Sequence, residues 1–335
     1  MKNHRNIPFF VPHAGCPNCC VFCSQTKITG QSAEKDINTE LFELKELLEN
    51  DCGGFEKSLI AFFGGSFTAI EKKRMEALLS LANEYIDKGV AEGIRISTRP
   101  DCIDEEILAI LKKYRVTHIE LGVQSTNDSV LRASKRGHSA SDSFESARLI
   151  TEGGFEFCGQ MMIGLPQSTP EDEIKTARDI IAMGATEARI YPTVVFEGTE
   201  LFEMASIGEY TPLTNDAAIE RTAKCCRLLE EAGVKILRIG LHASENLKKA
   251  PLGANHQALG ELVKSRIYSD IIAERAGNCK NKILCIGIRA SDISMLRGHG
   301  CAAINRIIGE TDCAGVEIYP ADLPRYEPDI KTRSV

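Results

Sequence analysis

Apolar segments of strand length alternate with helical patterns along most of this chain. The strand-like segments are nearly continuous apolar runs, which is typical of strands buried on both faces of a parallel sheet. We predict strands at Ile7–His13, Ser58–Gly65, Gly93–Thr98, Thr117–Ser125, Phe155–Gly164 and Ala188–Phe196. We predict the helices between and after them at Ile37–Glu49, Ile70–Asp87, Asp104–Tyr114, Ser141–Glu152, Pro170–Met183 and Asp216–Ala232.

This alternation predicts an α/β fold, with a parallel sheet covered by helices. Six strand–helix units are fewer than the eight of a closed barrel, so an open partial barrel and a doubly wound sheet both fit the pattern. A further strand at Lys235–Leu241 would close this region. We predict a core over residues 1–245, a helical connector over 246–279 and a small α/β module over 280–335.

Three cysteines follow the first predicted strand with the spacing Cys16-x-x-x-Cys20-x-x-Cys23. Three thiolates can hold three irons of a [4Fe–4S] cluster and leave the fourth open, whereas electron carriers usually ligate all four. Cys19 also divides the run into two Cys-x-x-Cys pairs, which would suit a tetrahedral zinc ion. The spacing favours iron–sulfur, because zinc sites normally take their two pairs from separate turns.

This spacing, with Phe22 before the last cysteine, is similar to the signature of the radical S-adenosylmethionine (SAM) superfamily. Further motifs follow in order: GGSFT at Gly64–Thr68, TRPD at Thr98–Asp101, ELGVQS at Glu120–Ser125, RGH at Arg136–His138 and IYPTVVFEGTEL at Ile190–Leu201. Together they resemble the radical SAM half of elongator-type tRNA-modifying enzymes and of bacterial relatives without an acetyltransferase. The resemblance covers roughly residues 5–245 and implies a partial (β/α)6 barrel of the TIM type, with the C-terminal part as a small α/β extension.

The resemblance also implies a [4Fe–4S] cluster on Cys16, Cys20 and Cys23, with SAM bound beside it. The implied SAM contacts are Phe22, Gly64, Gly65, Ser66, Phe67, Thr68, Arg99, Gln124, Ile163 and Gly164. A low-potential electron donor of the ferredoxin or flavodoxin type would reduce the cluster. SAM would then split to methionine and a 5′-deoxyadenosyl radical, which takes hydrogen from an unactivated carbon.

Neighbouring polar residues have structural or weaker interpretations. Asp101 is expected to cap the following helix. Glu120 needs a polar partner if it is buried, and Arg136 is the candidate. Tyr191 and Thr193 are weaker candidates for lining a substrate cavity, and no role is assigned to the lone histidines His13 and His242.

The charge balance bears on partners and location. The formal net charge of −7 argues against a protein that grips nucleic acid over its whole surface. No apolar stretch approaches the ~18–20 residues of a membrane span, and the N-terminus does not resemble a signal peptide. We therefore expect a cytoplasmic protein with no membrane partner, whose thirteen cysteines are thiols or metal ligands.

The C-terminal part reads as a strand at Lys282–Ile288, helices over Ala290–Gly309 and a strand at Gly315–Tyr319. Its segment LRGHGCAAI resembles the centre of a KH module, whose GXXG loop clamps a nucleic-acid backbone, with Cys301 in place of the last glycine. Residues 280–309 hold five Lys or Arg against one Asp, which suits phosphate contact. A small cap that closes the barrel is the alternative.

These observations leave three hypotheses. The first is a radical SAM enzyme that acts on RNA, such as tRNA. The second keeps this chemistry on a small molecule such as a porphyrinogen, which the acidic charge favours. The third is a zinc-binding scaffold protein without catalysis. Too few residues follow Leu241 for a typical acetyltransferase domain, so acetyl-coenzyme A is not expected as a cosubstrate.

Overall fold

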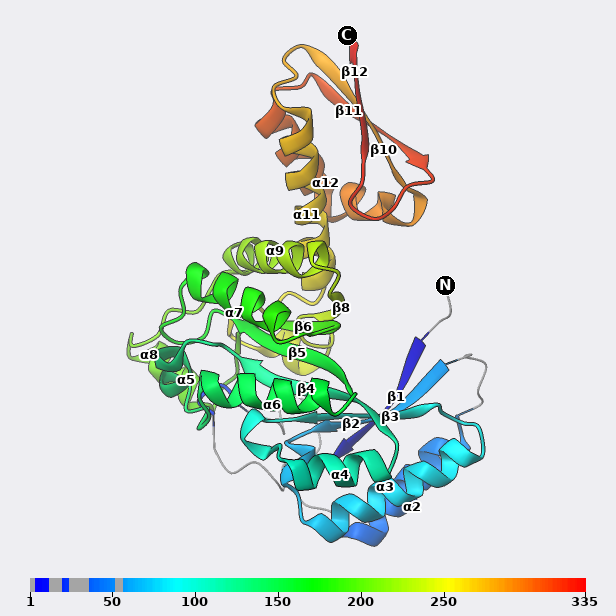
Figure 1. Ribbon diagram of the computed structural model, residues 1–335. Helices are drawn as coiled ribbons and strands as arrows, with labels where there is room; N and C mark the ends of the chain where they lie inside the picture. Colours follow the sequence, from blue (N-terminus) through cyan, green and yellow to red (C-terminus); the bar gives the residue numbers. More distant parts are fainter. Residues whose placement is uncertain (1–3, 12–19, 24–35, 52–56) are drawn as a thin grey trace.

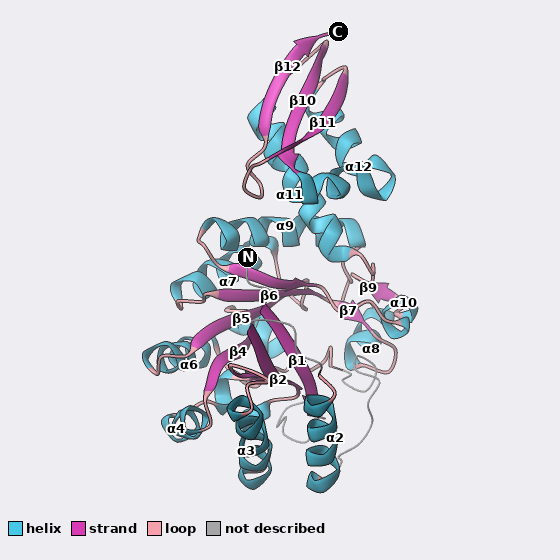
Figure 2. Cartoon of the chain, turned by 90° about the vertical axis from the view of Figure 1, so that its right-hand side faces the viewer, coloured by secondary structure: helices cyan, strands magenta, loops and turns pink. Residues whose placement is uncertain are grey.

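A seven-stranded parallel sheet forms the centre of the computed structural model, which describes residues 4–11, 20–23, 36–51 and 57–335. The strands follow one another in the order β1-β2-β3-β4-β5-β6-β8 and curl into an open half barrel (Figures 1 and 2). They are β1 (His4–Val11), β2 (Lys57–Gly64), β3 (Gly93–Thr98), β4 (Val116–Gln124), β5 (Glu156–Ile163), β6 (Glu187–Pro192) and β8 (Lys235–Ile239). The expected partial barrel is confirmed, and β8 is the predicted further strand.

Helices connect successive strands, and all but the short α5 cover the convex face of this sheet (Figure 1). They are α2 (Ile37–Glu49), α3 (Lys72–Asp87), α4 (Glu105–Lys113), α5 (Asp128–Ala133), α6 (Ala140–Glu152), α7 (Pro170–Ala182) and α9 (Asn215–Glu231). Two of them start at capping boxes, α6 at Ser139 with Asp142 and α7 at Thr169 with Asp172. Each box satisfies backbone N–H groups that a helix start leaves unpaired, which explains why these predicted starts were accurate to within about one residue.

Alternation along each strand divides its side chains between two environments. Ile94, Ile119, Phe157 and Ile190 are at most 1% exposed and pack in the main apolar core. Residues one position along face the concave side, where polar groups gather. The concave side therefore holds the site, while the convex side stabilises the barrel.

Smaller elements surround the open end of the barrel and lead to the C-terminal part. They are α8 (Glu200–Ser206), α10 (Glu245–Lys249) and the antiparallel pair β7 (Val194–Val195) with β9 (Leu252–Gly253). The long helix α11 (Leu259–Ala276) then leads to the C-terminal part. Helix α11 lies within the connector that was predicted to be helical, residues 246–279. No helix in the described ranges is both long and apolar enough to span a bilayer.

The C-terminal part is a three-stranded sheet next to α11 and α12 (Ile293–Thr311) (Figure 1). The central strand β10 (Lys282–Arg289) runs parallel to β11 (Gly315–Ala321) and antiparallel to β12 (Asp329–Ser334). Helix α11 contributes to both apolar cores: Val263 and Ile267 pack in the main core, Tyr268 and Ile272 in the second. The three-part division of the chain stays a proposal.

The predicted loop between two helices is not a separate element. A short 3-10 turn at Ala290–Asp292 leads directly into α12. Within α12, however, Gly300 and Cys301 have φ angles of 67° and 60°. Left-handed residues cannot continue a right-handed helix, so α12 is interrupted where the sequence predicted the loop.

Glu173 ties the end of β5 to α9 and is 2% exposed. Its carboxylate accepts from the backbone N–H of Gly164 at 2.6 Å and from Nε and Nη2 of Arg221 at 2.8 and 2.6 Å. Removing one partner of a buried pair leaves the other charge unpaired, which is far more costly than losing an exposed pair.

We expect Glu173→Ala to lower the free energy of unfolding by about 3 kcal/mol, because Arg221 and the Gly164 N–H lose their acceptor. Urea unfolding followed by circular dichroism measures this. Glu145→Ala is the control: it breaks an exposed pair with Arg148 and should cost about 0.5 kcal/mol. Equal losses in the two variants would contradict this role for Glu173.

Candidate functional site

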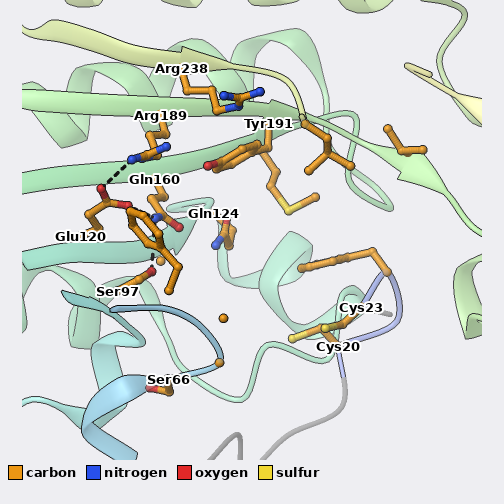
Figure 3. A pocket seen from close by; sticks show the side chains of 18 of the residues that line it. Cys20, Cys23, Ser66, Ser97, Glu120, Gln124, Gln160, Arg189, Tyr191 and Arg238 are labelled. Atoms are coloured by element: carbon orange, nitrogen blue, oxygen red, sulfur yellow. Dashed lines mark hydrogen bonds and ion pairs between the residues drawn. The ribbon is translucent and has the colours of Figure 1, made fainter. Parts of the chain in front are cut away.

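A cavity of about 340 Å³ opens on the concave side of the sheet, at the C-terminal ends of its strands (Figure 3). Its size falls in the range of small-molecule sites. Side chains from every strand of the half barrel line it, together with the segment that follows β1. The fold therefore brings residues from most of the chain to one chamber.

Cys20 and Cys23 both line this cavity, and Figure 3 shows their sulfur-bearing side chains side by side. A turn holds them, in which the Cys23 N–H donates to the Cys20 carbonyl at 3.0 Å. Val21 anchors the turn, donating to the Ser134 carbonyl at 3.2 Å and accepting from the Leu201 N–H at 2.9 Å. Cys16 and Cys19 lie outside the described residues.

Arg136 approaches the first of these thiols. Its Nη1 lies 3.4 Å from the Cys20 sulfur, and its Nη2 donates to the Gly122 carbonyl at 2.7 Å. The RGH motif thus supports the cysteine segment.

Six of the predicted SAM contacts line the cavity with the cysteines: Phe22, Gly64, Gly65, Ser66, Arg99 and Gln124. Gly64 has a φ of 123°, and a Cβ there would lie 2.3 Å from the Val11 carbonyl oxygen. Close packing of β1 on β2 therefore already requires glycine at position 64. The Ser66 hydroxyl accepts a hydrogen bond from the backbone N–H of Arg99 at 3.1 Å, which links the C-terminal ends of β2 and β3.

Gln124 combines backbone strain with an unsatisfied polar group. Its φ is 62°, a left-handed conformation that is uncommon for a residue other than glycine. Its Oε1 is buried and has no hydrogen-bond partner among the described residues. Both features concentrate at binding sites, because a ligand can supply the missing donor.

Four predicted contacts are not among the lining residues: Phe67, Thr68, Ile163 and Gly164. Phe67 stacks on Phe62 in the main core, with ring centroids 4.6 Å apart. On β5, strand alternation turns Ile163 into the core and presents Met162 to the cavity instead. Contact of these four residues with SAM stays a prediction that the cavity does not support.

Arg99 already has a partner within the chain. Its Nε and Nη2 donate to the two carboxylate oxygens of Asp101 at 2.9 and 2.8 Å. The expectation that Asp101 caps the next helix is wrong, because Asp104 caps α4 by accepting from the Ile107 N–H at 2.7 Å. Because Nε and Nη2 of Arg99 both donate to Asp101, this guanidinium has a structural role at the cavity wall.

A row of polar side chains crosses the cavity floor, and sequence motifs alone did not identify it as a unit. It consists of Ser97, Glu120, Gln160, Arg189 and Arg238, one from each of five neighbouring strands (Figure 3). Strand register places Arg189 beside both Gln160 and Arg238. Residues an even number of positions from a known cavity-facing residue share its face of the strand. This rule could have predicted the row, but only once the strand register was known.

Glu120 is the acceptor at the centre of this row. Its Oε1 accepts from Arg95 Nη1 at 3.0 Å and from Arg189 Nη2 at 2.9 Å, and its Oε2 accepts from Gln160 Nε2 at 2.7 Å. The suggested partner Arg136 is therefore wrong. Glu120 is 0% exposed, so its negative charge depends on these donors.

His138, the last residue of the RGH motif, is buried beside β4. One ring nitrogen lies 3.3 Å from the Val123 carbonyl, and Nδ1 has no partner among the described residues. Burial, and next the Arg136 guanidinium, lower the pKa of His138 from 6.5 to about 4. The ring is therefore neutral at pH 7.

This pKa predicts acid sensitivity. In the unfolded chain His138 becomes protonated as the pH falls below 6.5, whereas in the folded chain it becomes protonated only near pH 4. The stabilisation is thus complete above pH 6.5 and lost as the pH falls to 4, on the order of 3 kcal/mol in all. Urea unfolding between pH 7 and 4 should show this extra loss for the parent but not for His138→Gln, which does not titrate. Parallel pH profiles would contradict it.

Comparisons with known proteins agree with this geometry. The family model of the radical SAM superfamily matches residues 10–180, and that of the radical SAM C-terminal domain matches residues 185–269. An uncharacterized protein of Methanocaldococcus jannaschii is 29% identical, over 78% of this chain and 82% of its own length.

In the named relatives, the match covers a smaller share of the relative's own length. A tRNA uridine(34) acetyltransferase of Methanocaldococcus infernus is 31% identical over 49% of this chain, which spans 35% of that protein. The solved structure of Methanocaldococcus infernus Elp3 without its N-terminal residues 1–46 superposes with a TM-score of 0.64 at 23% identity. It covers 81% of this chain, which spans 64% of that one.

The superfamily model covers more than half of the chain, and the fold superposes on that of the Methanocaldococcus infernus Elp3 structure. We conclude that this chain is an enzyme of the radical SAM superfamily, related to the Elp3 proteins.

Proposed function

We propose that this enzyme holds a [4Fe–4S] cluster on Cys16, Cys20 and Cys23, binds SAM beside it, and acts on RNA of the tRNA type. One observation carries the first part. The cavity places the Cys20 and Cys23 thiols in the same chamber as the backbone of Gly65 and the unpaired Oε1 of Gln124.

The donor set fits the cluster and SAM. The thiols supply soft ligands, which suit iron–sulfur clusters. The backbone carbonyls at the end of β2, which lines the cavity, can accept hydrogen bonds from an ammonium group. The buried Gln124 Oε1 can accept from an amine or hydroxyl, which would relieve its desolvation cost. With the cluster and SAM bound, this site would supply a 5′-deoxyadenosyl radical that takes a hydrogen atom from the substrate.

The chain's own residues position these groups and limit side reactions. Val21 and its two backbone bonds hold the cysteine turn in place. Hydrogen bonds to ligating sulfurs raise or lower a cluster's reduction potential, so Arg136 would influence the electron transfer. The electron itself would come from a low-potential donor of the ferredoxin or flavodoxin type. Phe10, Phe63 and Met162 give the chamber apolar walls that exclude water.

Two observations support RNA as the substrate class. The relative from Methanocaldococcus infernus is named for a tRNA uridine. In the C-terminal part, Lys280, Lys282 and Arg297 are exposed, and the interruption in α12 is open: a Cβ added at Gly298 or Gly300 meets nothing within 4 Å. Arg297 adjoins these open glycines, where a phosphate backbone can approach closely. Lys280 and Lys282 lie near the C-terminal end of α12, beside Cys313.

The cluster assignment predicts a selective pattern among the cysteines. After anaerobic reconstitution with iron and sulfide, the dithionite-reduced protein should give a [4Fe–4S]⁺ EPR signal that changes when SAM is added. Cys16→Ser, Cys20→Ser and Cys23→Ser should each lose the signal, because three ligands are the minimum. Cys19→Ser is the matched control and should keep it. Loss of metal in the Cys19 variant, with zinc found by metal analysis, would instead support two Cys-x-x-Cys pairs.

The RNA proposal predicts salt-dependent binding. Gel shifts of the full chain with total tRNA should weaken steeply with salt. Combined Lys280→Gln, Lys282→Gln and Arg297→Gln should lower the slope of log K against log salt by about 2, at ~0.7 per phosphate contact. The control carries Lys45→Gln, Lys73→Gln and Lys113→Gln, exposed positions with the same change in charge. Equal slopes in both variants, or no binding by the parent, would favour a small-molecule substrate.

A further inference from the structure

One wall of the cavity carries more positive than negative charge. Strands β6 and β8 contribute Arg189, Tyr191 and Arg238 to it (Figure 3). His242, three residues after β8, also lines the cavity. Glu120 neutralises Arg189 at 2.9 Å. For Arg238, within the part of the chain that the structure describes, no carboxylate lies within the 4.0 Å of an ion pair.

Arg238 has a neutral partner that orients it. Its Nε donates to the Gly240 carbonyl at 3.0 Å, two residues along the chain. Since this bond occupies only Nε, the two terminal nitrogens remain available at the cavity surface. A half-buried cation without a counter-charge is costly, and an anion from outside the chain would offset that cost.

The groups around Arg238 are uncharged hydrogen-bond donors. Burial, and then Arg238 and Arg189, lower the pKa of His242, so its ring is neutral with one N–H at pH 7. Burial raises the pKa of Tyr191, so its hydroxyl keeps its proton. Around Arg238, the wall therefore presents hydrogen-bond donors from a guanidinium, a phenol and an imidazole. Among the described residues, it presents no unpaired carboxylate there.

We propose that Arg238, with Tyr191 and His242, binds an oxyanion of the substrate, either a phosphate or a carboxylate. A guanidinium suits both, because its planar fork donates two parallel hydrogen bonds to two oxygens. This inference rests on the proposed function, since it names the group by which that site holds its substrate.

The position of Arg238 separates this subsite from the SAM contacts. The glycines and Ser66 follow β2, and the cysteine segment follows β1, at one edge of the sheet. Arg238 lies on β8, at the opposite edge of the strand order. A substrate anchored there would reach across the polar floor toward the cysteines, with its reacting carbon between the two.

Isothermal titration of the reconstituted, SAM-bound protein tests this, with methyl phosphate and acetate as probes at constant ionic strength. We expect at least one of them to bind, and Arg238→Gln to weaken it by about tenfold or more, since the charged fork is lost. Arg148→Gln removes an exposed arginine far from the cavity and should leave binding unchanged. The SAM-dependent EPR change should be the same in both variants.

Each outcome has one meaning. Binding of methyl phosphate alone supports a phosphate-bearing substrate, and binding of acetate alone supports a carboxylate. If neither probe binds, or Arg238→Gln binds it as tightly as the parent does, the subsite is refuted. If Arg238→Gln weakens the response to SAM, Arg238 belongs to the SAM site and the inference is refuted. A parent protein without any SAM-dependent EPR change would refute the proposed function separately.

Discussion

The buried carboxylate of Glu120 is the interaction on which the rest of the barrel interior depends. It is 0% exposed and joins Arg95 on β3, Gln160 on β5 and Arg189 on β6. Arg95 also donates to Glu187 at 2.7 Å. This network resists change, because losing one charged partner would leave the other charge unpaired in a medium of low dielectric constant. It therefore fixes the relative positions of four strands and, with them, the floor of the chamber.

Support for the cysteine segment comes from far along the sequence. Val21 bonds to the backbone at Ser134 and Leu201 and packs in an apolar cluster with Val195, Leu201 and Tyr210. Arg136 reaches the Cys20 sulfur. Two motifs thus gain a physical meaning. Arg136 of the RGH motif and Leu201 at the end of IYPTVVFEGTEL hold the turn at residues 20–23.

The chamber has two sides with different chemistry. Backbone from the end of β2, together with Gln124 and the cysteines, forms a side with acceptors and soft ligands. The ends of β6 and β8 form a side with donors and excess positive charge. A site divided in this way can hold two different molecules at once, one by each side, which is what hydrogen transfer between a bound cofactor and a substrate requires.

The sequence by itself determined the fold class, most element boundaries and the family. Apolar periodicity and capping residues act over a few neighbouring positions, and the Cys16, Cys20 and Cys23 spacing lies within one loop, so both can be read locally. Only the tertiary structure decided which residues share the cavity. Met162 faces it and Ile163 does not, Arg99 pairs with Asp101, and Glu120 pairs with Arg95 and Arg189. These outcomes depend on strand register, where a shift of one residue exchanges the two faces of a strand, and register is set by packing across the whole sheet.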